Sequence, residues 1–236
     1  MTKSGIRRIN GFAGLGLALL AWPALSNTTA VDQQSFLYPE ERHETIGEIV
    51  TQFVQKSHYN RVAVDDDLSS KVYDLFIESL DRNRMYLLKG DIEYFESLRY
   101  ELDDIVKSEP MDPIFEVFQI YQTRVRERLT YALTQLESEP DFSLDESYQF
   151  DRSEEPWVES SAELDEIWRK RVKNDALALE LEEEPWEKTQ EVLTKRYNGY
   201  LRRLNQVNND DVFELSLIHI SEPTRPTRAS RMPSSA

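Results

Sequence analysis

Residues 112–136 read DPIFEVFQIYQTRVRERLTYALTQL, and this stretch indicates the fold class. Asp112 followed by Pro113 is typical of a helix start, because aspartate accepts hydrogen bonds from free amides and proline fits the first helical turn. Apolar side chains then recur every three or four residues, at Ile114, Val117, Phe118, Tyr121, Val125, Leu129, Ala132 and Leu136. That spacing places them on one face of a long helix, which we expect to end before Pro140.

The same pattern recurs on both sides of this stretch. Each of five further predicted helices has residues that favour a helix start, namely Pro39, Asp66 or Asp67, Asp91, the Ser160–Glu163 pair and Pro185. The first of these helices has a predicted inner face made of Ile46, Ile49, Val50, Phe53 and Val54, and the third has one made of Ile92, Phe95, Leu98, Leu102 and Ile105. Asn209 or Asp210 is expected to cap a seventh helix.

Glycine is scarce along most of the chain. Four of the seven glycines fall within the segment 1–26, so the rest of the chain has only Gly47, Gly90 and Gly199. A β fold needs many tight turns with positive φ, which glycine favours. We therefore predict an all-α fold, a bundle of about six helices over residues 40–214, with a possible internal boundary in the proline-containing loop 140–159.

The N-terminal segment 1–26 resembles a secretory signal peptide. Lys3, Arg7 and Arg8 precede a short apolar run, and small residues follow it. We expect cleavage after Ser26, with Ala30 as the alternative, a flexible segment at 27–39, no transmembrane anchor after cleavage, and a periplasmic location. The chain contains no cysteine, so no disulfide can stabilise it.

The net charge of −16 conceals a more acidic central segment. The segment 1–26 carries three basic side chains and no acidic one, and the segment 215–236 carries three arginines and one glutamate, so the segment 27–214 carries −21. An acidic surface repels phosphate backbones, and we expect no nucleic-acid partner.

No group of residues with a catalytic or metal-binding spacing stands out. His43 and Glu44 form half of a zinc-helix motif without the second histidine, and we interpret His43 as a solvated residue near a helix start. His58 has no nearby ligand cluster, and the run at 65–67 lacks the glycine and terminal glutamate of a calcium loop, which makes helix capping the simpler interpretation. We predict no catalytic, cofactor-binding or metal-binding residues in this chain, and no cofactor.

Five motifs in order carry a family resemblance. They are SHYNR (57–61), LDRNRMYLLKGDIEYF (80–95), YQFDRSEEPW (148–157), WRKRVKNDALALEL (168–181) and LTKRYNGYLRRLNQVNNDDVFE (193–214). In this respect the chain resembles the N-terminal helical region of tail-specific proteases, the carboxy-terminal processing peptidases of Gram-negative periplasm.

The resemblance implies a larger multidomain serine endopeptidase that degrades or processes proteins from apolar C-termini. In that family a PDZ domain captures the substrate and a Ser/Lys dyad cuts it, and the helical regions can dock a lipoprotein adaptor. These domains would follow Glu214, so we expect the chain itself to be an inactive fragment that supplies the scaffold. The alternative is a free-standing periplasmic helical adaptor or binding module.

The C-terminal segment LSLIHISEPTRPTRASRMPSSA (215–236) differs in composition from the rest of the chain. A disordered linker or a native alternative ending could account for it. A third interpretation is that the tail is translated adapter DNA from a sequencing library. The codons CTG TCT CTT ATA CAC ATC would encode LSLIHI, and they resemble the adapter used in transposon-based library preparation. Codons that would encode SRMPSSA (230–236) resemble the distal adapter. We favour this third interpretation and expect residues 215–236 to be non-native and disordered.

Overall fold

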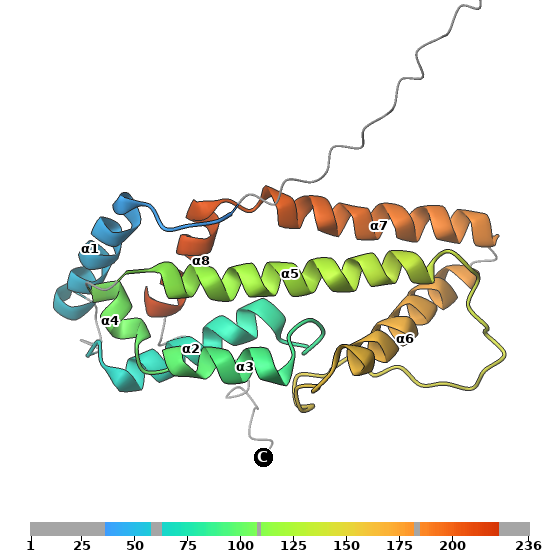
Figure 1. The fold of residues 1–236 in the computed structure, drawn as a ribbon, viewed down its shortest axis with the longest axis horizontal. Helices are drawn as coiled ribbons and strands as arrows, with labels where there is room; N and C mark the ends of the chain where they lie inside the picture. The colour runs from blue at the N-terminus through green and yellow to red at the C-terminus, as the bar shows by residue number, and fades with distance from the viewer. Residues whose placement is uncertain (1–35, 58–62, 108–109, 182–184, 222–236) are drawn as a thin grey trace, which may run out of the picture. The chain divides into compact units, whose positions relative to one another are not determined.

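The computed structural model describes residues 36–57, 63–107, 110–181 and 185–221, and helices dominate these ranges (Figure 1). The elements are α1 (Glu41–Ser57), α2 (Asp66–Asp81), α3 (Lys89–Phe95), the 3-10 helix η1 (Glu96–Leu98), α4 (Leu102–Lys107), α5 (Asp112–Gln135), α6 (Ser161–Glu180), α7 (Trp186–Gln206) and α8 (Asn209–Ser221). The described ranges contain no strand, so the all-α prediction is confirmed. The predicted signal peptide, residues 27–35 and His58 lie outside the described ranges.

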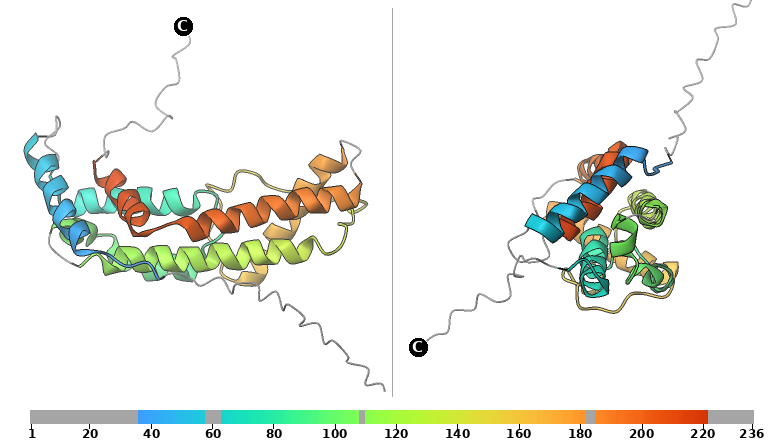
Figure 2. Two further views of the ribbon diagram at one scale, coloured as in Figure 1. Left: turned by 90° about the horizontal axis from the view of Figure 1, so that it is seen from above. Right: turned by 90° about the vertical axis from the view of Figure 1, so that its left-hand side faces the viewer.

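Helix α5 connects two apolar cores, one on each half of its length (Figures 1 and 2). Its N-terminal half packs with α2, α3, α4 and α8, around Phe76, Leu87, Phe95, Phe115 and Val212. Its C-terminal half packs with α6 and α7, around Leu129, Trp168, Leu193 and Tyr197. The 112–136 pattern therefore predicted the element that both cores share.

The single helix predicted after Asp91 is divided into three short elements. The hydroxyl of Ser69 on α2 donates to the carbonyl of Arg99 and accepts from the amide of Leu102, both at 2.9 Å. A side chain from a neighbouring helix thus replaces bonds within the helix, which interrupts the helical ladder. This interruption is one reason why the described ranges contain more helices than the sequence predicts.

Four of the predicted caps are displaced along the chain. Met111 and not Asp112 holds the cap position of α5, which begins at Asp112. At the start of α8 the side chain of Asn208, and not of Asn209 or Asp210, accepts from the amides of Asp210 and Asp211 at 2.8 and 3.1 Å. Helix α2 is capped by Asp65, whose carboxylate accepts from the amide of Leu68 at 3.2 Å, and not by Asp66 or Asp67. Asp91 lies inside α3, where its carboxylate accepts from the amide of Leu88 at 2.9 Å. The predicted cap at Ser160 is confirmed, since its hydroxyl accepts from the amide of Glu163 at 3.4 Å.

The inner face predicted for α1 is wrong at Ile46 and Ile49, whereas Val50 packs against the first core as expected, and the side chains of Phe53 and Val54 lie outside the described part of the chain. Ile46 and Ile49 are 41% and 61% exposed, while His43, Gly47 and Thr51 face the core. Gly47 explains the rotation, because a Cβ there would lie 2.7 Å from Cε of Met111, so the helix approaches closely only on its glycine side.

The loop 140–159 is held to the neighbouring helices by polar contacts. Glu146 pairs with Arg169 and, at 2.6 Å, with Lys173, both on α6. The amide of Lys89 donates to the carbonyl of Val158 at 2.8 Å. Trp157 is half-buried against the first core, whereas Phe150 is 69% exposed, so the aromatic residues of the loop pack against the domain only in part.

Helix α8 extends beyond the predicted change at Leu215. Residues 215–221 are helical, Ser216 is buried, and Leu215 and Leu217 pack against the first core. The expected disorder is therefore wrong for 215–221, because a helix that has already started continues over apolar residues that find a packing surface. Residues 222–236 lie outside the described ranges, and an adapter origin stays a prediction.

Across the described ranges, no helix combines the length and the apolar character needed to cross a membrane.

Candidate interaction grooves

A buried aspartate organises the turn between α2 and α3. The carboxylate of Asp81, which is 3% exposed, accepts hydrogen bonds from the amides of Met85, Tyr86 and Leu87 at 2.8, 2.7 and 2.9 Å. Arg84 adopts a left-handed conformation with φ of 52°, which reverses the chain. Burial raises the pKa of Asp81, and the three amides act in the opposite direction.

This Asp81 turn, residues 81–89, also joins the two cores. The indole nitrogen of Trp168, a fully buried residue of α6, donates to the carbonyl of Met85 at 2.7 Å. The side chain of Met85 lies in the second core and that of Leu87 in the first. The motif LDRNRMYLLKG is thus a structural connection in which the aspartate replaces missing backbone acceptors.

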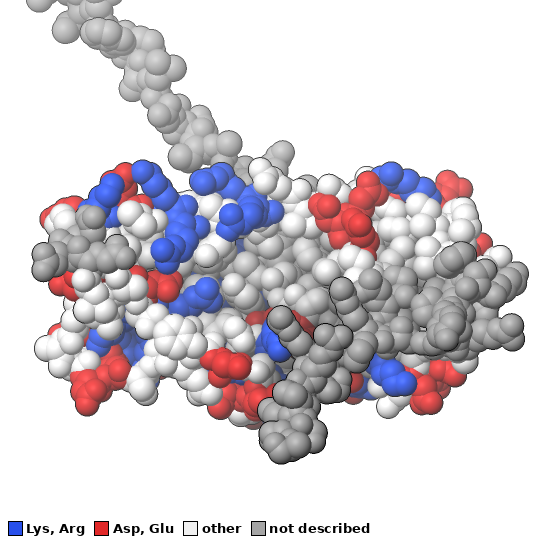
Figure 3. Space-filling model, turned by 180° about the vertical axis from the view of Figure 1, so that it is seen from behind, with Lys and Arg blue, Asp and Glu red and all other residues white. Residues whose placement is uncertain are grey.

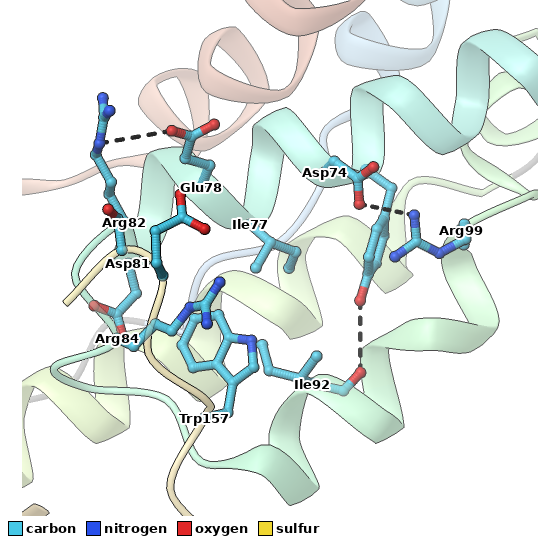
Figure 4. Close-up of a pocket in the computed structure, with 12 residues that line it drawn as sticks. Asp74, Ile77, Glu78, Asp81, Arg82, Arg84, Ile92, Arg99 and Trp157 are labelled. Carbon is cyan, nitrogen blue, oxygen red and sulfur yellow. Dashed lines mark hydrogen bonds and ion pairs between the residues drawn. The ribbon is translucent and has the colours of Figure 1, made fainter.

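A groove of about 340 Å³ lies beside this turn, between α2, α3 and Trp157 (Figure 4). Arg99 pairs with Asp74 at 2.7 Å and Arg82 with Glu78 at 3.6 Å. The guanidinium of Arg84 lies 5.3 Å from the centre of the Trp157 ring. We call this cavity the turn groove; most of its charged side chains already have partners within it.

A second groove, also of about 340 Å³, lies between α5 and α7 and is closed by parts of α2 and α8. Its wall is mainly aromatic and aliphatic, with Phe118, Tyr121, Tyr86, Tyr200 and Leu204 among the lining residues. The Tyr86 and Tyr121 rings meet edge to face with centres 5.9 Å apart. Burial raises the pKa of both phenols, so they remain neutral. We call this cavity the α5–α7 groove.

One rim of the α5–α7 groove carries a positive charge, from Arg203 at the C-terminal end of α7, and this helix is basic as a whole. Helix α7 carries Lys188, Lys195, Arg196, Arg202 and Arg203 against two glutamates. Lys and Arg side chains gather over α7 at the upper left of Figure 3. The guanidinium of Arg203 lies 4.8 Å from the centre of the Tyr200 ring, and within the described ranges no carboxylate pairs with Arg202 or Arg203.

His43 is a core residue, so its interpretation as a solvated side chain is wrong. Its ring is fully buried and stacks on Phe213 with centres 4.5 Å apart. Nδ1 accepts from the amide of Glu40 at 3.0 Å, which leaves the proton on Nε2, 2.9 Å from the carboxylate of Asp210. Both hydrogen bonds lower the cost of burying an imidazole. The pKa of Asp210 is lowered, mainly by its bond to His43.

The other candidate residues remain apart. Glu44 is exposed, and the 65–67 run lies at the start of α2, where Asp65 is the cap. Among the described residues, no three or more His, Asp or Glu side chains gather in a way that could hold a metal ion. Neither groove has a signature in the sequence, because each brings together segments that are far apart in the chain.

The fold defines the class of protein: an all-α domain with two apolar cores on a shared helix and two surface grooves. Comparison with known proteins identifies the family. The family described as "Tail specific protease N-terminal domain" matches residues 49–223. The chain belongs to this family, which confirms the resemblance carried by the five motifs.

A curated relative gives the same result. The tail-specific protease of Haemophilus influenzae is 34% identical over 163 residues, which cover 69% of this chain and 24% of the relative. The chain therefore spans about a quarter of the length of that relative. The family match ends at residue 223, in agreement with a helix that extends past Glu214.

Proposed function

We propose that this chain is the N-terminal helical region of a periplasmic serine endopeptidase that degrades or processes proteins from apolar C-termini. Family membership carries the proposal, since the relative from Haemophilus influenzae is named as a tail-specific protease and matches over the helical region. In this proposal the helical region is a scaffold and docking platform, and PDZ and Ser/Lys domains of the longer protein bind and cut the substrate.

The construction of the domain supports a scaffold role. Two cores share α5, and the Asp81 turn and Trp168 connect them through buried hydrogen bonds. Such coupling favours a rigid platform, which is what a docking surface for substrates or a lipoprotein adaptor needs. The basic, apolar and small segments of residues 1–26 support export to the periplasm.

A chimaera tests the scaffold role directly. Residues 36–221 would replace the matched region of the Haemophilus influenzae relative, and cleavage of a reporter with an apolar tail would be compared with cleavage of the same reporter ending in aspartates. We expect the chimaera to keep tail-dependent cleavage. A folded chimaera that has lost all cleavage would contradict an equivalent scaffold role.

The chain alone provides the matched control. We expect it to leave both reporters intact, because the proposal places the cutting groups in other domains. Tail-dependent cleavage that persists through repurification would show that the chain is itself an enzyme. Export is tested separately by fusing residues 1–30 to alkaline phosphatase, which is active only after export, and inactive fusions would contradict the periplasmic location.

A further inference from the structure

The α5–α7 groove combines an apolar wall with positive charge on one rim. Phe118, Tyr121 and Tyr200 form much of the wall, and the phenol of Tyr121 remains neutral. Its volume of about 340 Å³ lies at the lower end of the range for ligand sites, roughly 300–1,000 Å³. A cavity of this size and polarity suits one or two apolar side chains.

The charge on the rim is unusual for this chain. Residues 27–214 carry −21 overall, yet α7 has five basic side chains against two acidic ones. Lys195 pairs with Glu191 at 2.5 Å, and Arg196 lies 3.9 Å from Asp175. Arg202 and Arg203 lie at the end of α7 that borders the groove, and neither has a carboxylate partner among the described residues. Both are exposed, so their donors are available to a partner.

Arg203 connects these two properties. It lines the groove and lies over the Tyr200 ring, with its guanidinium 4.8 Å from the ring centre. A stacked guanidinium is held in orientation and still presents its N–H donors along its edge, which suits a carboxylate. A ligand that fits must therefore place a carboxylate beside an apolar side chain.

We propose that the α5–α7 groove docks an acidic amphipathic segment of a partner protein, with its apolar side chains in the groove and a carboxylate on Arg203. Charge complementarity favours this occupant: the segment 27–214 is acidic overall and disfavours an acidic ligand, whereas α7 has an excess of basic side chains. The turn groove is a weaker candidate, because Arg82 and Arg99 are already paired with its own acids.

The inference does not depend on the proposed protease function. A helical domain of any activity would present the same groove. The binding test below contains no cleavage step, so failure of the docking proposal and failure of the protease proposal are distinguishable.

The probe is a fluorescent peptide of about five helical turns, designed as an amphipathic helix with leucines on one face and glutamates flanking them. Its isosteric version has glutamine at every glutamate. Fluorescence anisotropy with the full chain should show saturable binding of the glutamate peptide. We expect binding at least tenfold weaker for the glutamine peptide, and weaker binding in high salt, because the charge-assisted contacts are lost or screened.

Three variants locate the site. Arg203→Ala should weaken binding of the glutamate peptide about tenfold. Ser79→Trp places a large ring at the groove from an exposed position of α2 and should block both peptides. Lys188→Ala removes a charge from the far end of α7, about 22 Å along the helix, and should leave binding unchanged. All three positions lie outside the core, and circular dichroism melts check that the variants fold.

Several results would overturn the proposal. These are absence of binding by the glutamate peptide, equal affinity for the two peptides, or equal losses in Arg203→Ala and Lys188→Ala. A peptide with a free apolar C-terminus that binds Arg203 while the acidic helix does not would show a different ligand. Self-association that Ser79→Trp abolishes would show that a second copy fills the groove, and this too would contradict the proposal.

Discussion

Replacement of Asp81 gives the sharpest test of how the domain is held together. The carboxylate accepts hydrogen bonds from three backbone amides, with nitrogen–oxygen distances of 2.9 Å or less. Two of these amides belong to Met85 and Leu87, which are 3% and 0% exposed. Asp81→Ala leaves those amides without acceptors. Each buried unsatisfied donor costs about 1–3 kcal/mol, and release of the buried carboxylate offsets part of the sum.

A net loss of about 3 kcal/mol follows from these contributions. For a domain of this size the melting temperature falls by about 2–4 °C per kcal/mol, so we expect Asp81→Ala to melt roughly 6–12 °C below the wild type. Asp81→Asn keeps one oxygen for Tyr86 and Leu87 but turns an NH₂ group toward the amide of Met85, and should lose about half as much.

Differential scanning calorimetry measures these shifts. Asp74→Ala is the matched control, because Asp74 is on the same helix but its side chain is 66% exposed and contributes one surface ion pair, worth at most about 1 kcal/mol. If the melting temperature of Asp81→Ala fell by no more than that of the Asp74→Ala control, the carboxylate would not organise the turn and the reasoning would be refuted.

Three further predictions concern α1 and the loop. His43→Ala should lose about 2–4 kcal/mol in urea titration, because it removes a fully buried ring stacked on Phe213, and an unchanged midpoint would exclude that role. Gly47→Leu should destabilise the domain by about 1–3 kcal/mol more than Gly47→Ala, since Met111 can move away from one methyl group but not from a full side chain; equal melting temperatures would argue against close packing at this position. The pKa of Glu146 is lowered to about 2 by Arg169 and Lys173, so the ion pairs of Glu146 contribute fully to stability above pH 4.5 and lose that contribution as the pH falls toward 2. The difference in melting temperature between wild type and Glu146→Gln should therefore close over that range. A difference that stayed constant would contradict the pairing.

The parts of the fold that were predictable depend on local patterns. The 112–136 stretch has a proline start and a continuous apolar face, and α5 lies within one residue of the expected bounds. The Ser160 cap is equally local. The face of α1 was mispredicted because the contact is made by a glycine and a histidine, which an apolar pattern does not count.

Other features depend on contacts between segments far apart in the sequence. Ser69 interrupts the third predicted helix from 30 residues away, and nothing near Arg99 signals this break. The α5–α7 groove brings together Ser79, Tyr121 and Arg203, which no spacing rule relates. The role of Asp81 could have been suspected from an aspartate at the end of an apolar helix before a polar turn, because such residues often bond the following amides.

Native mass spectrometry of the full chain with the acidic amphipathic peptide tests most directly the claim that this region docks partners and leaves cutting to other domains. One spectrum records both the complex and the mass of the bound peptide. We predict a one-to-one complex that contains the peptide intact and is reduced by Arg203→Ala but not by Lys188→Ala. Shortened peptide, or no complex that depends on Arg203, would contradict the account.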